Sequence, residues 1–202
     1  MEIILVRHAE SECNRLGTHA GQKIDAGLSE EGIKQAEKLA RRLKNEKIER
    51  IYSSDLKRAN HTAEIINKFH NVKIIPDKRL REFDCGDLLP LKNKFKIFEE
   101  HRKKEAKRLG INPLEVKTPG GESEWDHIQR VSSFIEELEN KKLKKVLIVG
   151  HGGTNKVFFG VIGHFPYERM YEIKQSNTGL SIIKKEGKKY KAHLINCTKH
   201  LE

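Results

Sequence analysis

Short apolar runs alternate with longer amphipathic stretches along almost the whole chain. The runs that we expect to form strands cover residues 2–6, 48–52, 72–75, 145–149, 179–185 and 190–195. The amphipathic stretches predict helices over residues 29–44, 55–68, 92–109, 123–140 and 153–162. This order predicts a three-layer α/β/α domain with a mostly parallel sheet of about six strands. The last two strands form a closing hairpin, which predicts one antiparallel edge.

The stretch 88–119 interrupts this alternation. Its helix has few apolar anchors, which are Phe95, Ile97, Phe98 and Leu109, and it is bounded by Pro90 and Pro113. We interpret the stretch as a small helical cap over the strand ends. Because 202 residues are enough for one substantial core and few for two, we expect a single domain over residues 1–202 with a cap insertion at about 88–119.

The chain is strongly basic, with a formal net charge of +11. Part of the excess is clustered, because residues 92–108 hold eight basic residues against three glutamates. Such a field attracts anions, including nucleic acid. No aromatic platform or nucleic-acid module accompanies it, so we do not expect nucleic acid as a partner.

The distribution of apolar residues and cysteines indicates a cytoplasmic protein. No run approaches the ~20 apolar residues of a membrane helix, and Arg7 interrupts the apolar start before a signal-peptide core can form. The three cysteines form no spaced pair, which fits a reducing compartment. We therefore expect a cytoplasmic location and no membrane partner.

Groups suited to phosphate chemistry follow two of the predicted strands. The first strand runs into Arg7 and His8, and the strand at 145–149 runs into Gly150-His151-Gly152-Gly153-Thr154. Parallel strands present their carboxyl ends at one edge, where an imidazole can attack a phosphoryl group that a guanidinium grips. Glycines and a helix N-terminus let the backbone approach an anion. A nucleotide P-loop is excluded, because Asn155-Lys156-Val157 stands where Gly-Lys-Ser/Thr is required.

Two further predicted strands are followed by candidate groups. After the strand at 48–52, Ser54 or Asp55 is expected to cap a helix that carries Arg58 on its first turn. After the strand at 72–75, Glu82 stands in the segment 80–87, where the residues alone are equally compatible with an ordinary loop carboxylate. Further on, Ser123 and Asp126 form a capping box for the helix at 123–140.

These segments resemble the signatures of the histidine phosphatase superfamily, the phosphoglycerate mutase-like family, in its small phosphatase branch. Residues 7–10 resemble its Arg-His-Gly/Ala-Glu motif, and residues 80–86 its Leu-x-Glu-x-x-x-Gly segment. Residues 120–123 match Gly-Gly-Glu-Ser, and residues 195–201 resemble the Leu-Asn-x-Thr-x-His-Leu ending. The chain departs from the pattern at 87–90 and at 21–25, where it lacks the aromatic residues that are common in the family.

The resemblance implies a mechanism and a set of site residues. His8 would attack phosphorus and become a phosphohistidine, Arg7, Arg58 and His151 would hold the phosphoryl oxygens, and Glu82 would protonate the leaving group. The substrate-binding residues that we predict are Asn14, Ser11, Gly152, Glu122 and Asn177, with Ser54 as a further candidate.

A metal site formed by His8, His151 and Glu82 is an alternative that electrostatics disfavours. Each of the two arginines would repel a divalent cation, and one contact near 4 Å is worth about 4 kcal/mol at an effective dielectric constant of about 20. We therefore expect no metal and no cofactor.

The predicted function is hydrolysis of a small phosphorylated metabolite by a phosphomonoesterase. The alternative is a cofactor-dependent phosphoglycerate mutase, which would use the same phosphohistidine and return the phosphate to a substrate. Family mutases generally have a longer middle insertion, so the short 88–119 segment favours the hydrolase. A binder of phosphorylated ligands without activity is disfavoured, because all five catalytic positions are filled. The expected partner is a small phosphomonoester, and monomer and homodimer both stay open.

Overall fold

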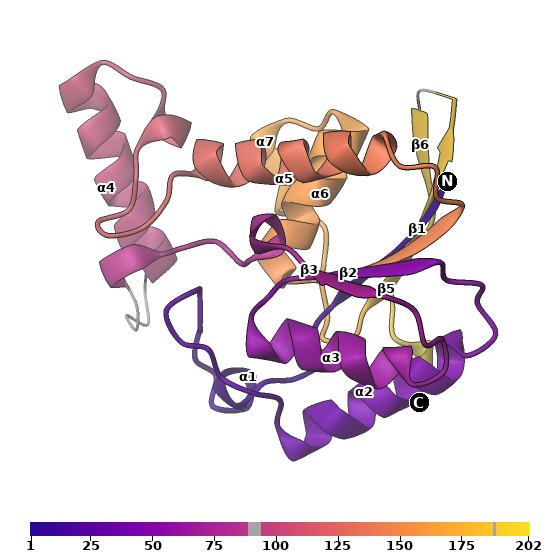
Figure 1. Ribbon diagram of the computed structural model, residues 1–202. Helices are drawn as coiled ribbons and strands as arrows, with labels where there is room; N and C mark the ends of the chain where they lie inside the picture. Colours follow the sequence, from indigo (N-terminus) through magenta and orange to yellow (C-terminus); the bar gives the residue numbers. More distant parts are fainter. Residues whose placement is uncertain (89–93, 188) are drawn as a thin grey trace.

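A six-stranded sheet forms the centre of the computed structural model, which describes residues 1–88, 94–187 and 189–202 (Figure 1). Its strands are β1 (Glu2–Arg7), β2 (Arg50–Ser53), β3 (Ile74–Pro76), β4 (Lys145–Gly150), β5 (Leu180–Glu186) and β6 (Lys189–Cys197), in the spatial order β3-β2-β4-β1-β5-β6. The pairs β1/β4, β2/β4 and β2/β3 are parallel, whereas β5 pairs antiparallel with β1 and β6. The mostly parallel sheet with an antiparallel hairpin at one edge is thus confirmed.

Helices cover both faces of the sheet. In Figure 1, α2 (Glu30–Leu43) and α3 (Lys57–Asn67) lie on one face, and α5 (Glu124–Glu139) and α6 (Gly152–Gly163) lie on the other. The four-residue helices α1 (Glu12–Arg15) and α7 (Tyr167–Met170) were not expected, because a single turn leaves no hydrophobic period to detect. Four 3-10 turns, η1 (Lys78–Leu80), η2 (Gly86–Leu88), η3 (Pro113–Glu115) and η4 (Lys199–Leu201), complete the described elements.

Successive residues of the central strands face opposite layers. Ile4 and Val6 of β1 pack into the core under α2 and α3, whereas Ile3 and Leu5 pack into the core under α5 and α6. This follows from the two-residue period of a strand, and it explains why β1 reads as a continuous apolar run. The polar residues that follow such a buried strand are therefore held on a rigid support.

The N-terminal caps of α3 and α5 fix where these two helices start. Ser123 and Asp126 form the expected capping box at α5. The expected cap of α3 by Ser54 or Asp55 is wrong, because α3 begins at Lys57 and the side chain of its N-cap, Leu56, makes no capping hydrogen bond. Instead, Asp25 from a distant loop accepts the Lys57 N–H at 2.7 Å. Asp55 is drawn away by Arg81, which donates two hydrogen bonds of 2.6 Å to its carboxylate.

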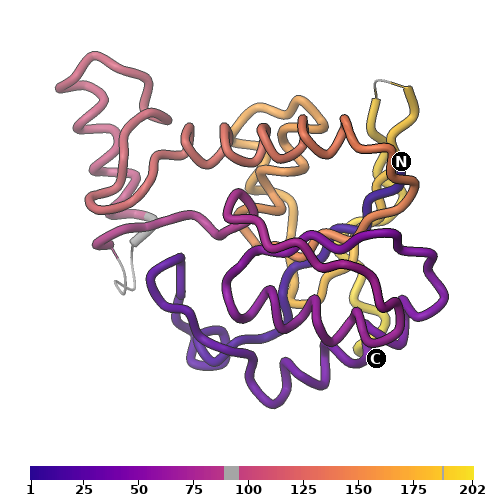
Figure 2. Tube along the Cα trace, viewed as in Figure 1, coloured from indigo at the N-terminus to yellow at the C-terminus, as the bar shows by residue number. Residues whose placement is uncertain are grey.

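The stretch that we interpret as a cap insertion contains α4 (Lys94–Leu109) and η3. Figures 1 and 2 both place α4 beyond the N-terminal end of α5, at the end of the molecule away from β6. The expected start of this helix at residue 92 lies outside the described residues, as does the side chain of Phe95. Of the other predicted anchors, only Phe98 is buried, and it packs on Phe83 and Cys85.

Ile97 and Leu109, the remaining predicted anchors of α4, are exposed. The buried stripe instead runs through Phe98, Arg102 and Ala106, which recur every four residues on one face of the helix. Arg102 escaped prediction because a charged side chain is not counted as apolar, although its guanidinium lies over the rings of Phe98 and Tyr167.

The first turn of α2 packs directly on the backbone beside the end of β1, at Gly32. A Cβ atom at this position would overlap the carbonyl oxygen of Glu10. We expect Gly32→Ala to lower the free energy of unfolding by about 1–3 kcal/mol, although alanine is the better helix former, because the overlap forces α2 away from that backbone. Urea denaturation measures this loss. Gly27→Ala is the control, since nothing lies within 4 Å of its Cβ position, and equal stability of the two variants would contradict the expectation.

Candidate active site

The imidazole of His8 is fixed directly after β1. Its backbone N–H donates to the Gly150 carbonyl at 2.9 Å, and its Nδ1 lies 2.7 Å from the Ala9 carbonyl oxygen. A carbonyl only accepts, so Nδ1 carries the proton and Nε2 keeps its lone pair. Burial lowers the pKa of His8 well below its ordinary value, and the charges of Arg58 and Arg7 lower it further. The ring is therefore neutral near pH 7, with Nε2 as its nucleophilic atom.

Two arginines, of which Arg58 is buried and Arg7 is partly buried, approach His8 from different elements. Arg7 ends β1 and donates through Nη1 to the Gln175 carbonyl at 2.8 Å. Arg58 lies on the first turn of α3, is 2% exposed, and donates to the carbonyls of Gly21 at 2.8 Å and Ile24 at 3.3 Å. Burial lowers the pKa of both guanidinium groups, while the nearby Glu82 opposes the shift. An arginine remains charged in proteins, so the site holds two fixed cations.

His151 follows β4 and is the N-cap of α6. Its ring centroid lies 5.0 Å from that of His8, at an interplanar angle of 61°. The ring is fully buried, and neither nitrogen has a hydrogen-bond partner among the described residues. Burial, followed by the charge of Arg58, lowers the pKa of His151 well below its ordinary value. Buried polar atoms normally find partners, so two unpaired nitrogens indicate a place for a polar ligand.

The carboxylate of Glu82 closes the N-terminus of α6. It accepts hydrogen bonds from the backbone N–H groups of Gly153 at 3.0 Å, Thr154 at 3.2 Å and Phe83 at 3.0 Å. The first N–H groups of a helix lack partners within the helix, and its N-terminus favours a negative charge. Glu82 thus links the segment after β3 to the segment after β4.

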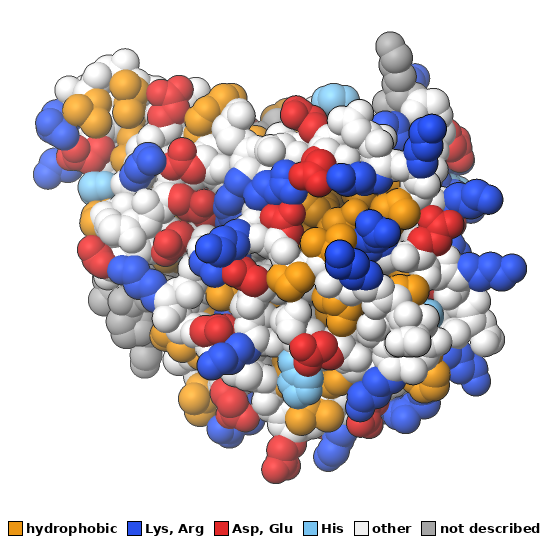
Figure 3. Space-filling view, in the orientation of Figure 1, with side chains coloured by type: hydrophobic (Ala, Val, Ile, Leu, Met, Phe, Trp, Pro, Cys, Tyr) orange, Lys and Arg blue, Asp and Glu red, His pale blue; other side chains and the backbone are white. Residues whose placement is uncertain are grey.

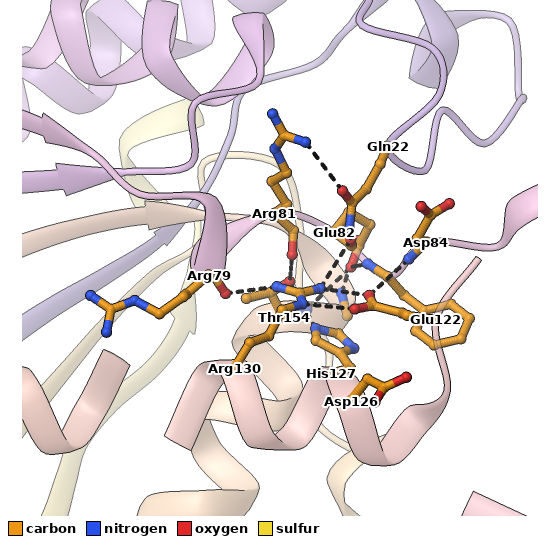
Figure 4. Close-up of polar contacts among 12 residues, drawn as sticks. Gln22, Arg79, Arg81, Glu82, Asp84, Glu122, Asp126, His127, Arg130 and Thr154 are labelled. Atoms are coloured by element: carbon orange, nitrogen blue, oxygen red, sulfur yellow. Dashed lines mark hydrogen bonds and ion pairs between the residues drawn. The ribbon is translucent and has the colours of Figure 1, made fainter. Parts of the chain in front are cut away.

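A polar network fixes the backbone around Glu82 (Figure 4). Arg130 of α5 donates to the carbonyls of Arg79 at 2.6 Å and Glu82 at 3.1 Å, and Gln22 also donates to Glu82 O at 2.9 Å. Thr154 donates its hydroxyl hydrogen to the Arg81 carbonyl at 2.6 Å, and the Nε2 of His127 lies 3.1 Å from the Thr154 hydroxyl oxygen. Such support holds a functional carboxylate in one orientation.

The other predicted binding residues make contacts within the protein. Ser11 and Asn14 form a capping box at α1, and Asn177 donates to the His8 carbonyl at 2.9 Å and to Asn14 at 3.2 Å. Glu122 is paired with Arg130, and its carboxylate also accepts the Asp84 N–H at 2.9 Å.

Ser54 follows β2 and accepts the Leu56 N–H at 3.3 Å. Among the predicted binding residues, only Gly152 lines the cavity beside Arg7 and Glu82. The side chains of the others bind to neighbouring groups of the protein.

A cavity of about 440 Å³ opens beside these groups. Its walls include Arg7, Glu82, Gly152 and Gly153, together with residues that the sequence analysis did not assign to the site: His19, Glu124, Lys156, Tyr171, Lys174 and Gln175. Lys156 carried a detectable signal, because it stands one helical turn after Gly152 on the same face of α6. Glu124 is the first residue of α5, and the other four lie outside regular elements, where no local pattern predicts their position.

The described part of the chain holds neither a cluster of metal-ligating side chains nor a membrane-spanning helix. Over residues 1–88, 94–187 and 189–202, no group of three or more His, Cys, Asp or Glu side chains is placed to hold a metal ion. Within the same residues, no helix has both the length and the apolar character needed to cross a membrane.

The geometry defines a class of site. Two neutral imidazoles, two guanidinium groups and a helix N-terminus converge with one carboxylate, which suits the binding and transfer of a phosphoryl group. Residues 3–198 match the family model of the histidine phosphatase superfamily (branch 1), and the chain belongs to this family.

Known proteins resemble the chain over nearly its whole length. It is 32% identical to phosphoserine phosphatase 1 of Hydrogenobacter thermophilus over 205 residues, which cover 100% of this chain and 94% of the relative. It is also 32% identical to phosphoglycerate mutase-like protein 4 of Arabidopsis thaliana over 209 residues, 100% of this chain and 87% of the relative. The structure of the alpha-ribazole phosphatase from Shigella flexneri matches with a TM-score of 0.83 at 25% identity, covering 98% and 97% of the two chains.

Proposed function

We propose that this protein is a phosphomonoesterase that hydrolyses a small phosphorylated metabolite through a covalent phosphohistidine on His8. The observation that carries the proposal is the contact of His8 Nδ1 with the Ala9 carbonyl, which leaves a free lone pair on Nε2 beside Arg7 and Arg58. Relatives named as phosphatases support the same assignment.

The first half of the reaction forms the phosphoenzyme. His8 Nε2 attacks phosphorus in line, the N–P bond forms, and the bond between phosphorus and the ester oxygen breaks. Glu82, protonated at this stage, gives its proton to the departing alkoxide so that an alcohol leaves. Arg7, Arg58 and His151 stabilise the charge on the other phosphoryl oxygens, and the cavity-lining N-terminus of α6 adds its positive end.

The second half releases phosphate. Glu82, now a carboxylate, takes a proton from water as the water oxygen attacks phosphorus, and the N–P bond breaks. Inorganic phosphate leaves, and His8 returns to its neutral form, in which Nδ1–H still donates a hydrogen bond to the Ala9 carbonyl. The two arginines neutralise the phosphoryl group, a task that other phosphoryl-transfer enzymes give to metal ions.

A phosphoglycerate mutase is the second candidate, because the chain is similar to a relative named as mutase-like. A mutase would use the same first half and then pass the phosphoryl group to a hydroxyl of the bound substrate in place of water. The two candidates therefore differ only in the acceptor of the phosphoryl group.

We expect phosphate release from phosphomonoesters to persist after exhaustive treatment with a chelator, because the fixed cations are part of the chain. A panel that includes phosphoserine and α-ribazole phosphate, assayed for free phosphate with and without chelator, measures this. A parallel mutase assay with 3-phosphoglycerate and 2,3-bisphosphoglycerate tests the second candidate. Loss of activity that a divalent metal restores would contradict the metal-free mechanism, and isomerisation faster than phosphate release would favour the mutase.

A further inference from the structure

Lys156 lies in the cavity beyond the phosphoryl site. It stands four residues after Gly152 on α6, which corresponds to about 6 Å along the helix axis. Its ammonium donates to the Tyr171 carbonyl at 3.1 Å and lies 5.4 Å from the centre of the Tyr171 ring. The mechanism above gives this partly buried cation no task.

The hydrogen-bonding capacity of Lys156 is not filled by the protein. An ammonium group has three N–H donors, and the Tyr171 carbonyl is its one hydrogen-bond acceptor within the described residues. Burial lowers the pKa of Lys156, and the charge of Arg7 adds to that effect while Glu82 opposes it. An anion bound beside the ammonium would offset this loss of hydration.

The carboxylates that share the cavity are already engaged. Glu82 accepts three backbone N–H groups at the start of α6, and Glu124 accepts the hydroxyl of Tyr171 at 2.9 Å. Lys174, which also lines the cavity, is exposed and forms no ion pair with another described residue. Lys156 therefore has no carboxylate partner among the described residues, and an anionic ligand would supply the missing negative charge.

We propose that Lys156, assisted by Lys174, binds an anionic group on the leaving alcohol, so that the preferred substrate is a phosphomonoester with a second negative charge. This inference rests on the proposed function, and it assigns the half of the site that the transferred phosphoryl group does not occupy. A carboxylate and a second phosphate have the chemistry that an ammonium group recognises.

Three matched esters test the preference. Glycerol 3-phosphate has an uncharged tail, 3-phosphoglycerate replaces one end with a carboxylate, and glycerol 1,3-bisphosphate adds a second phosphate. We expect kcat/KM to be at least tenfold higher for one or both anionic esters than for glycerol 3-phosphate. The ester with the larger advantage identifies the kind of anion, and no advantage for either overturns the proposal.

The Lys156→Met variant assigns the preference to this side chain. We expect the ratio of kcat/KM for the favoured anionic ester to that for glycerol 3-phosphate to fall at least tenfold, mainly through KM. Lys142→Met is the matched control, because Lys142 is exposed and precedes the N-terminal end of β4, whereas the cavity lies beyond the C-terminal end. Lys156→Glu should shift the preference toward O-phosphoethanolamine, whose tail is cationic. A purely structural defect would lower kcat/KM for both esters by the same factor and leave the ratio unchanged. An unchanged ratio in Lys156→Met therefore contradicts the proposal.

Failure of this inference is distinguishable from failure of the proposed function. Turnover of nitrophenyl phosphate and of the three esters without a charge preference contradicts only the role of Lys156. If none of these esters is hydrolysed, the proposed function fails, and calorimetric binding of 3-phosphoglycerate and glycerol 3-phosphate to the parent and Lys156→Met proteins still decides the anion site. Equal affinity of both ligands for both proteins would overturn it.

Discussion

His8→Ala is expected to lower kcat for phosphate release by about 10⁴-fold or more, because it removes the only nitrogen that the proposed covalent route uses. Phosphate release from a reactive phosphomonoester measures the loss. Rapid quenching with a ³²P-labelled substrate should trap a phosphoenzyme that is labile in acid and stable in base in the parent protein, and none in the variant.

His61→Ala is the control for this experiment, since His61 is an exposed histidine on α3. Its activity and phosphoenzyme should match those of the parent. The thermal unfolding of His8→Ala establishes that the variant is folded. A phosphoenzyme in folded His8→Ala, at the level of the parent, would show that another residue is the nucleophile.

The second large effect is expected for Glu82→Gln, which removes the proposed proton donor and keeps a side chain of the same size. We expect kcat for alkyl phosphates to fall by about 10²- to 10⁴-fold. The defect should be much smaller for nitrophenyl phosphate, because nitrophenolate departs without a proton. The ratio of the two defects in steady-state assays is the decisive quantity.

Asp87→Asn provides a matched control, because the Asp87 side chain is 66% exposed and pairs with Lys23 at the surface. Removing its charge should change both substrates little. An equal loss for alkyl and aryl esters in Glu82→Gln would exclude Glu82 as the acid and would favour a role in holding α6.

The sheet could be predicted because a buried parallel strand has a simple pattern. Runs such as Ile3–Val6 and Val146–Val149 are apolar on both faces, and the parallel pairing of β1 with β4 brings Arg7 and Gly150 into register. The proximity of His8 to His151 follows from that register and from the rule that strand ends converge. The positions of His8 and His151 could therefore be predicted once β1 and β4 were taken as parallel neighbours in the sheet.

The contacts between distant loops could not be predicted. Asp25 caps α3 and Glu82 caps α6 across 32 and 72 positions of the chain, and neither pair has a periodic or local signal. A polar residue close to a helix start, such as Ser54 or Asp55, is the natural expectation for a cap, and tertiary contacts overrode it. The same limit applies to Glu122, since its carboxylate accepts the N–H of Asp84, which lies 38 positions away in the chain.

Glu82 and Arg58 join parts of the chain that would otherwise separate. Glu82 fastens the loop after β3 to α6, and Arg58 fastens α3 to the loop at Gly21 and Ile24. In many enzymes the functional residues are a burden on stability, and replacing them makes the protein more robust. At these two positions, to which we assign catalytic roles, we expect the opposite, because a substitution that removes the proposed role also removes contacts that hold the fold together. Selection for activity alone would then preserve the architecture, and laboratory evolution of this scaffold has reason to leave both residues untouched.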